Sequence, residues 1–299
     1  MKTDIAIIGG GAIGSAVAYY LKMKDPTVEV TVVERDPTYN LASTPRASGG
    51  VRRLFSLPEN IALSNFSILF FDNFADTMAV DGEKAEIGLT TVIFFIVPPT
   101  SRDMLKQNLD TELEIGCNVV WLEPDELKHK FPSMNVSDLG AAVHSPDDGW
   151  LDPHSVLMGF RKKARSLGAL YIADEVTGFD RKGPTVTRAK LKSGETLEAE
   201  QFVNAAGAWA KDLCEMLGFK VPIEPLRRIT NTTSEDQKTR SSRSPISKTQ
   251  NGLRSVPREK GTREACRRFK SRVDTTSKWI TTISRTSSGQ HSRIVSRSI

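Results

Sequence analysis

The fold is decided by residues 5–14, which read Ile5-Ala6-Ile7-Ile8-Gly9-Gly10-Gly11-Ala12-Ile13-Gly14. Four apolar residues predict a short buried strand, and residues 15–21, with small and apolar side chains at helical spacing, predict a helix after the glycines. Residues 28–33 predict a second buried strand, which ends on Glu34. Strand, glycine turn, helix and strand make a βαβ unit, so we expect an α/β fold with a parallel central sheet.

The glycines have the spacing of a dinucleotide-binding fingerprint. Gly9 would form the tight turn, Gly11 would let the backbone approach a pyrophosphate, and Gly14 would let the helix approach the strand. The first amides of the helix, at Ala12 and Ile13, would then face the phosphates. A glycine-rich turn without a ligand is the alternative, but the surrounding strands and helix favour a nucleotide.

The residue at the end of the second strand supports this interpretation. Glu34 follows Gly14 at the distance from which a carboxylate accepts hydrogen bonds from ribose hydroxyls. Such an acid would repel the 2′-phosphate of NADP, although Arg35 beside it weakens that argument. The fingerprint alone leaves FAD and NAD open.

Four segments, in family order, resemble flavoproteins of the D-amino-acid oxidase superfamily. They are Glu-Arg-Asp at 34–36, Ala-Ser-Thr-x-x-Ala-Ser-Gly-Gly-Val-Arg at 42–52, Glu-Val at 175–176 and Val-Asn-Ala-Ala-Gly-Ala-Trp-Ala at 203–210. In that family they pass the flavin, cover the adenine and form a second glycine turn. The match covers residues 1–228.

The resemblance implies FAD as the cofactor and an activity similar to that of glycine oxidase and sarcosine oxidase. Such enzymes transfer hydride from a small amine or amino acid to the flavin, which then passes electrons to oxygen or to an electron carrier. Besides the fingerprint residues and Glu34, the implied cofactor-binding positions are Arg35, Ser43, Thr44, Gly49, Gly50, Val176, Ala206, Gly207 and Trp209.

Arg52 is the candidate catalytic residue. The resemblance places it near the flavin ring and an anionic substrate, and a planar guanidinium suits a carboxylate or a reduced flavin. The alternative is a solvated or ion-paired arginine beside Arg53.

Other polar residues are interpreted as structural, and no metal site is predicted. His129, His144 and His154 lack the spacing of metal ligands or of a catalytic triad. Asp147-Asp148 precedes a glycine and Asp152 precedes a proline, so we expect turn and helix-cap roles for them.

We expect the FAD-binding domain to be two-layered and to be made of residues 1–87 and 148–228. An inserted, smaller α+β substrate domain would occupy residues 88–147, and residues 229–299 would be an unstructured tail. We expect a helix at 58–75 with a packed apolar face, and further helices at 102–115, from 123 and at 152–167. We expect strands at 89–97, 119–122, 170–172 and 201–204, and a hairpin at 186–199.

Composition restricts the possible partners and compartments. The longest apolar run, residues 91–97, is far too short to span a bilayer. Three scattered cysteines and the absence of a signal-peptide pattern predict a cytoplasmic protein. The net charge of +5 comes from the tail, which carries +11 against −6 upstream, and this distribution argues against a nucleic-acid-binding main domain.

The tail does not follow the pattern of the superfamily. Ser and Thr fill 25 of its 71 positions, and no helix or strand period is sustained. We interpret this as a shift of reading frame near Arg228. In one neighbouring frame the codons for 229–234 permit Tyr-Asn/His-Glu-His-Tyr-Phe, those for 258–266 permit Gly-Glu-Gly-Tyr-Ser-Gly-Gly-Val, and those for 278–296 permit a run with Asp-His-Asp-Tyr-Phe and Trp-Pro. These resemble family segments, and Trp279 before Ile280 forces one Asp of the last run.

The sequence therefore predicts an FAD-dependent oxidoreductase that is inactive through loss of its native C-terminal part. That loss would leave the flavin open to water and an edge of the sheet unpaired. Two alternatives remain open: an NAD-dependent dehydrogenase, and a non-enzymatic fragment whose basic tail binds nucleic acid or acidic partners.

Overall fold

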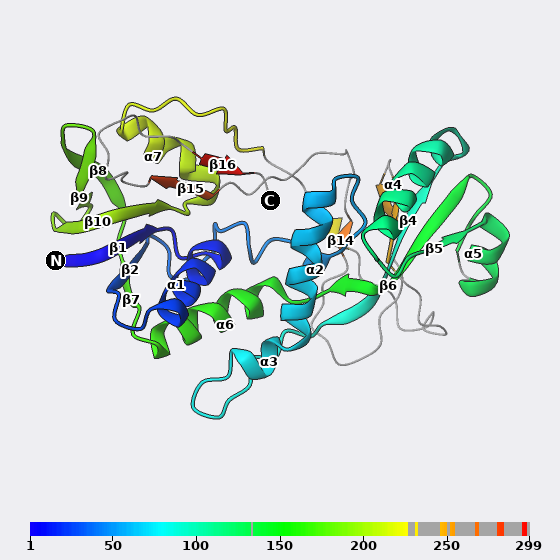
Figure 1. Cartoon of the computed structure of the whole chain (residues 1–299), viewed down its shortest axis with the longest axis horizontal. Coiled ribbons are helices and arrows are strands. Elements are labelled where there is room, and N and C mark those ends of the chain that lie inside the picture. The colour runs from blue at the N-terminus through cyan, green and yellow to red at the C-terminus, as the bar shows by residue number, and fades with distance from the viewer. Residues whose placement is uncertain are drawn as a thin grey trace.

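The computed structural model of the chain describes residues 1–132, 134–226, 231–232, 246–249, 252–254, 267–268, 280–283 and 295–297. Two sheets lie at opposite ends of the molecule, and helix α2 stands between them (Figure 1). The expected α/β fold is confirmed.

The first sheet carries the nucleotide fingerprint. Its parallel part runs in the order β7-β2-β1-β10. The strands are β1 (Lys2–Ile8), β2 (Val30–Glu34), β7 (Leu170–Ala173) and β10 (Thr196–Asn204). The chain leaves β1 toward β2 on one side and returns as β10 on the other, so the strand order reverses between β1 and β10. In open α/β sheets, ligands bind beyond the carboxyl ends of the strands at such a point.

Both faces of this sheet are covered, so the expected two layers are wrong. Successive residues of β1 point to opposite sides. Ile7 joins a core with α1 (Ala12–Lys24) and α6 (Pro153–Ser166), whereas Ala6 and Ile8 join a second core. The elements of that second core are β8 (Val176–Lys182), β9 (Thr185–Leu191) and α7 (Ala210–Met216). Because β9 pairs in antiparallel fashion with β10 on one side and with β8 on the other, the sheet is mixed.

The second sheet is antiparallel within the main part of the chain. Its strands are β3 (Gly50–Val51), β4 (Thr90–Val97), β5 (Val120–Leu122) and β6 (Ala141–Trp150). Helix α4 (Arg102–Glu114) covers one face, where it packs against Val97 and Val143, and α5 (Pro124–Lys130) covers the other. Since β3 comes from upstream of residue 88 and β6 runs past residue 147, this sheet is wider than the expected insertion. The domain bounds themselves stay a prediction.

Local sequence signals explain the starts and ends of several expected helices. The Asp152 side chain accepts a hydrogen bond from the His154 amide and caps α6, and Gly168, at φ +96°, follows the end of that helix. Glu123 and Glu126 form a capping box at the start of α5. These expected boundaries are confirmed.

The expected helix at 58–75 differs from the prediction. It is divided into α2 (Pro58–Asp72) and α3 (Phe74–Thr77), which meet at Asn73. Ile61 and Ile68 are buried, but Leu63, Phe66 and Leu69 are 39%, 62% and 65% exposed. The expectation that the whole apolar face packs is therefore wrong. A helix that is apolar on several sides can bury only the stripe that meets the core.

Most of the expected tail lies outside the described residues, so its unstructured character stays a prediction. The stretches described there are short strands. β15 (Ile280–Ile283) pairs in antiparallel fashion with β10, and β12 (Ile246–Thr249) pairs in parallel with β4. The expected unpaired edge is therefore wrong for β10, because the tail itself supplies its neighbour.

The packing of α6 against α3 gives a test of this core. A Cβ on Gly159 would lie 2.6 Å from Cε1 of Phe74, which is fully buried. Gly159→Ala is expected to lower the free energy of unfolding by about 1–3 kcal/mol, because overpacking outweighs the better helix propensity of alanine. Urea unfolding followed by circular dichroism measures the change.

Phe74→Leu in the same chain removes the obstructing ring and should restore part of the loss. A Gly159→Ala variant that is more stable than the wild type would show that α6 does not pack against Phe74 in this way.

Candidate FAD site

The site is built where two glycine turns touch. After β1, the Gly9 amide donates to the Val33 carbonyl at 2.8 Å, and after β10 the Ala205 amide donates to the Ile8 carbonyl at 2.9 Å. Gly9 has φ +103°, and a Cβ there would lie 2.5 Å from the Ala205 carbonyl oxygen. Gly9 must therefore be glycine both for its backbone conformation and for the contact between the turns.

The third glycine of the fingerprint is also fixed by protein contacts. A Cβ on Gly14 would lie 1.8 Å from the Gly9 carbonyl oxygen, which no relaxation of a side chain can relieve. The Ser15 hydroxyl donates to the Gly10 carbonyl at 2.9 Å and further ties α1 to the turn. These contacts hold the N-terminus of α1 at the end of β1.

Gly11 is different, because no protein atom crowds it. Of the atoms that a Cβ there would meet, the nearest is Thr44 Oγ1, at 3.9 Å. Gly11 is the N-cap of α1 and its φ is −63°, so its backbone conformation does not require glycine. The space beside Gly11 is thus kept open in front of a helix N-terminus, where an anionic group is stabilised by the helix dipole and by amides such as those of Ala12 and Ile13. The Ala12 amide has Thr44 Oγ1 as a long acceptor, at 3.5 Å.

Glu34 is fixed by two backbone amides. Its Oε2 accepts from the Gly10 amide at 2.7 Å, and its Oε1 accepts from the Asp36 amide at 2.9 Å. Each carboxylate oxygen has a further lone pair, so the two oxygens can still accept hydrogen bonds from a pair of ribose hydroxyls. The first hydrogen bond also links the acid directly to the fingerprint turn.

Arg35, next to Glu34, contacts the second glycine turn. Its guanidinium carbon lies 3.7 Å from the centroid of the Trp209 ring, in cation–π geometry, and its Nη1 lies 3.7 Å from Glu175 Oε1. Trp209 closes the short helix η2 (Gly207–Trp209). Val176, which follows Glu175, is buried in the core beneath. Arg35 therefore lies between Glu175 and the second turn, whereas the predicted Val176 lies in the core.

Asn204 is a residue of this site that the sequence prediction did not select. It is buried at the end of β10, its Nδ2 donates to the Ala210 carbonyl at 2.8 Å and contacts Cys214 Sγ at 3.5 Å, and its Oδ1 accepts from the Ala206 amide at 3.2 Å. These bonds shape the second turn from inside. A lone amide at the end of an apolar strand and before a glycine turn was the available signal.

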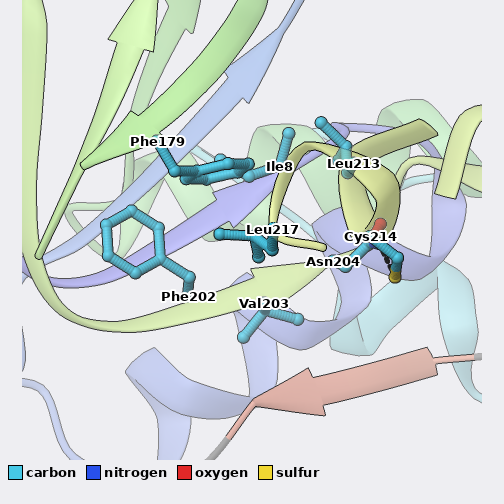
Figure 2. A pocket seen from close by; sticks show the side chains of 8 residues that line it. All are labelled: Ile8, Phe179, Phe202, Val203, Asn204, Leu213, Cys214 and Leu217. Atoms are coloured by element: carbon cyan, nitrogen blue, oxygen red, sulfur yellow. Dashed lines mark hydrogen bonds between the residues drawn. The ribbon is translucent and has the colours of Figure 1, made fainter. Parts of the chain in front are cut away.

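A small apolar cavity lies behind Asn204 and does not form part of the site (Figure 2). Its volume is about 20 Å³, room for one water molecule. Its lining comes from β1, β8, β10, α7 and the residue after α7: Ile8, Phe179, Phe202, Val203, Asn204, Leu213, Cys214 and Leu217. We interpret it as imperfect packing under α7.

The predicted loop at 42–52 connects the two sheets. Ser43 is exposed, Thr44 lies near the α1 N-terminus, and Ser48 Oγ is buried without a hydrogen-bond partner among the described residues. Gly49, at φ +74°, is required by the protein itself, since a Cβ would lie 1.9 Å from the Leu151 carbonyl oxygen. Gly50 begins β3 and pairs with β6.

Arg52 is half-buried at the second sheet. Its Nε donates to the Leu54 carbonyl at 3.2 Å, and its guanidinium lies 4.6 Å from the centre of the Phe55 ring. Burial lowers the pKa of Arg52, and the charges of Asp148 and Glu112 oppose that shift. Both the catalytic role and the alternative of a solvated or ion-paired arginine stay predictions.

The two acids near Arg52 were not recognised as a pair from the sequence. Glu112 is 3% exposed, and burial, with a smaller contribution from the charge of Asp148, raises its pKa to about 8. Asp148 is fully buried, and burial raises its pKa as well. Glu112 and Asp148 are neighbours because β6 passes beside the end of α4.

The expected turn role of Asp147-Asp148 is wrong. Both lie within β6, where the Arg53 amide donates to Asp148 Oδ2 at 2.7 Å and Arg53 Nη1 contacts Asp147 Oδ2 at 3.2 Å. Aspartates beside a glycine favour turns, but here Gly149 pairs with Val51 and the strand continues.

The histidines do not gather, as far as the described residues show. His144 is buried in β6, where burial and the nearby Lys130 lower its pKa to about 4. In the part of the chain that the structure describes, no group of three His, Cys, Asp or Glu side chains could hold a metal ion, and no helix is long and apolar enough to cross a membrane.

Comparison with known proteins identifies the family of this site. The family model described as FAD dependent oxidoreductase matches residues 4–269. The chain belongs to this family. FAD-dependent oxidoreductase domain-containing protein 1 of Xenopus laevis is 33% identical over 262 residues, covering 76% of this chain and 52% of the relative; the Bos taurus protein is 31% identical, covering 76% and 54%. The chain therefore spans about half the length of these relatives.

Two solved structures share the fold. L-proline dehydrogenase from P. horikoshii has a TM-score of 0.71 at 24% identity, with 84% of this chain and 66% of that chain covered. Glycine oxidase from Geobacillus kaustophilus has a TM-score of 0.71 at 22% identity, with 86% and 68% covered. The expected similarity to the D-amino-acid oxidase superfamily is confirmed.

The geometry fits the FAD of this family. The free space at Gly11 suits the central pyrophosphate, and the remaining lone pairs of Glu34 suit the ribose on one side of it. The contacts of each predicted residue with FAD remain predictions.

Two glycine substitutions separate cofactor binding from folding. Gly11→Ala should leave the melting temperature of the apoprotein nearly unchanged and weaken FAD binding about tenfold or more, because its methyl group would fill space that only a ligand uses. Gly14→Ala should lower the melting temperature itself, because its methyl group meets the Gly9 carbonyl. Apoprotein calorimetry and titration of flavin fluorescence measure the two effects. An unchanged FAD affinity in Gly11→Ala would contradict the assignment of the site.

Glu112 should make stability depend on pH. Its pKa in the folded protein, about 8, is above its ordinary value of 4.5. Its contribution is therefore fully present below pH 4.5 and is lost as the pH rises toward 8, at no more than about 1.4 kcal/mol per pH unit. Glu112→Gln should flatten the unfolding free energy over this range, whereas Glu114→Gln, on the exposed side of α4, should not. Parallel slopes in the wild type and Glu112→Gln, measured by urea unfolding, would refute the buried-acid interpretation.

Proposed function

We propose that this FAD-dependent oxidoreductase belongs with enzymes that oxidise a small amine or amino acid. The supporting observation is that relatives named for such activities match across most of the chain. Human mitochondrial dimethylglycine dehydrogenase is 27% identical over 78% of this chain, and sarcosine oxidase subunit beta of an Arthrobacter species is 25% identical over 78%. The acceptor of the electrons would be oxygen or an electron carrier.

The described residues include those that would bind the cofactor in such an activity. The open amides of α1 would hold the pyrophosphate, Glu34 would hold the ribose, and the stack of Arg35 on Trp209 would form a wall beside the adenine. FAD, when bound, supplies a ring that accepts a hydride from the substrate carbon. Arg52 would orient a substrate carboxylate from its place near Glu112 and Asp148.

The proposal also includes loss of catalysis in this chain. The family model matches as far as residue 269, but beyond Arg228 the chain does not show the glycine-rich and Trp-Pro segments that the resemblance leads us to expect there. A flavin ring that these segments do not enclose would be exposed to water, and catalysis by such enzymes depends on excluding it.

A shift of reading frame near Arg228 is our proposed origin of the difference. Resequencing the coding DNA from the codon for Leu226 onward tests it. An open neighbouring frame that encodes the glycine-rich and Trp-Pro segments would support the proposal. A confirmed frame would overturn it and would favour the alternative in which the basic tail binds an acidic partner.

Flavin content and flavin reduction test the two halves of the proposal. The purified chain should release FAD on denaturation, while anaerobic addition of sarcosine, dimethylglycine, glycine or proline should leave the flavin absorbance near 450 nm nearly unchanged. A chain in which the neighbouring frame is restored should bleach with at least one of them. Release of NAD would support the dehydrogenase alternative, which the family match argues against.

Bleaching of the unaltered chain would overturn the proposed inactivity and leave the family assignment intact. Glu34→Gln, which removes one negative charge and alters the hydrogen bonds to Gly10 and Asp36, should reduce the FAD content of both chains. A cytoplasmic location remains part of the proposal, to be tested by fractionation.

A further inference from the structure

A partly buried arginine on α6 contacts the loop that leaves Glu34. Arg161 Nη1 donates to the Pro37 carbonyl at 3.4 Å, and its guanidinium carbon lies 5.4 Å from the centre of the Tyr39 ring. The sequence prediction assigned Arg161 no role. Its position, 124 residues along the chain from Pro37, means that only the fold brings α6 to this loop.

The loop itself has an unusual conformation at the point of contact. Tyr39 is 2% exposed and has φ +58°, in the left-handed region that a bulky residue rarely adopts. Its amide donates to the Asp36 carbonyl at 2.8 Å, and its carbonyl accepts from the Ala42 amide at 3.1 Å. Such a conformation persists only where surrounding contacts hold it. The ring under Arg161 is one of those contacts.

The same guanidinium is also connected to the fingerprint turn, through the ring of a second tyrosine and two hydroxyl groups. It lies 5.6 Å from the centre of the Tyr171 ring on β7. The Tyr171 hydroxyl donates to Ser15 Oγ at 3.0 Å, and Ser15 Oγ donates to the Gly10 carbonyl at 2.9 Å. Arg161 is thus packed between one tyrosine of the loop and one tyrosine connected to Gly10.

We infer that Arg161 is a positioning residue for FAD, which holds the loop of residues 36–44 against the fingerprint turn. This loop begins after the ribose acid Glu34 and ends at Thr44, whose hydroxyl faces the Ala12 amide and the space at Gly11. When the loop is held, Thr44 and Glu34 keep a fixed spacing. A rigid spacing lowers the entropy that the cofactor must remove on binding.

The expected magnitude follows from the contacts. Replacing Arg161 by a neutral side chain removes two cation–π contacts and one hydrogen bond. If these contacts act on loop order, their loss should weaken FAD binding about tenfold. The inference depends on FAD binding at this site, which belongs to the proposed function.

The test compares FAD affinity with apoprotein stability in matched variants. Arg161→Met keeps the length of the side chain and removes its charge and donors, whereas Arg165→Met, one turn later on the exposed side of α6, is the control. Arg161→Met should raise the Kd for FAD about tenfold, mostly through faster release, and Arg165→Met should leave it unchanged. Arg161→Lys, which keeps a cation over the rings, should recover part of the affinity.

A double-mutant comparison distinguishes positioning from a general loss of stability. Tyr39→Leu should weaken FAD binding similarly, and Arg161→Met combined with Tyr39→Leu should be little worse than either change alone, because both break the same contact. A lower melting temperature of Arg161→Met with an unchanged Kd would overturn the inference, as would fully additive effects on Kd. Failure of the unaltered chain to bind FAD would instead overturn the cofactor site itself.

Discussion

The whole site depends on the contact between two backbone turns that are almost 200 residues apart in the chain. The Gly9 backbone lies against the Ala205 carbonyl, and the Gly9 carbonyl lies against Gly14. This contact fixes β1, β10 and α1 in one arrangement, with no side chain between them. Since neither turn can move without a clash, the space in front of α1 keeps its shape, and Glu34 and Arg35 need only be placed around it.

Much of this could be predicted because the signals are local. Gly9 and Gly14 follow a strand at fixed spacing, and the structure explains both by contacts with neighbouring backbone. Gly11 is more informative, since no contact with the described residues accounts for it. Glu34 and Trp209 were predicted from family segments, but the stacking of Trp209 on Arg35 required the fold, because the two residues are distant in sequence.

The errors have a common physical reason: local propensity was overruled by tertiary pairing. Asp148 and Gly149 favour a turn locally, yet pairing with β3 and β4 keeps them in a strand. The apolar residues of α2 predicted one packed face, but periodicity cannot say which of several apolar stripes meets the core, and Phe66 is largely exposed. Glu112 could not be associated with Asp148 at all, because helix and strand positions become neighbours only through register.

The stack of Arg35 on Trp209 has an optical consequence. An indole under a guanidinium, at the place where the adenosine half of the cofactor is expected, emits according to what lies beside it. Trp209 is therefore a natural reporter of the state of the second turn. A change in the packing of Arg35 on Trp209 would alter the intrinsic emission of the protein, to which three other tryptophans also contribute.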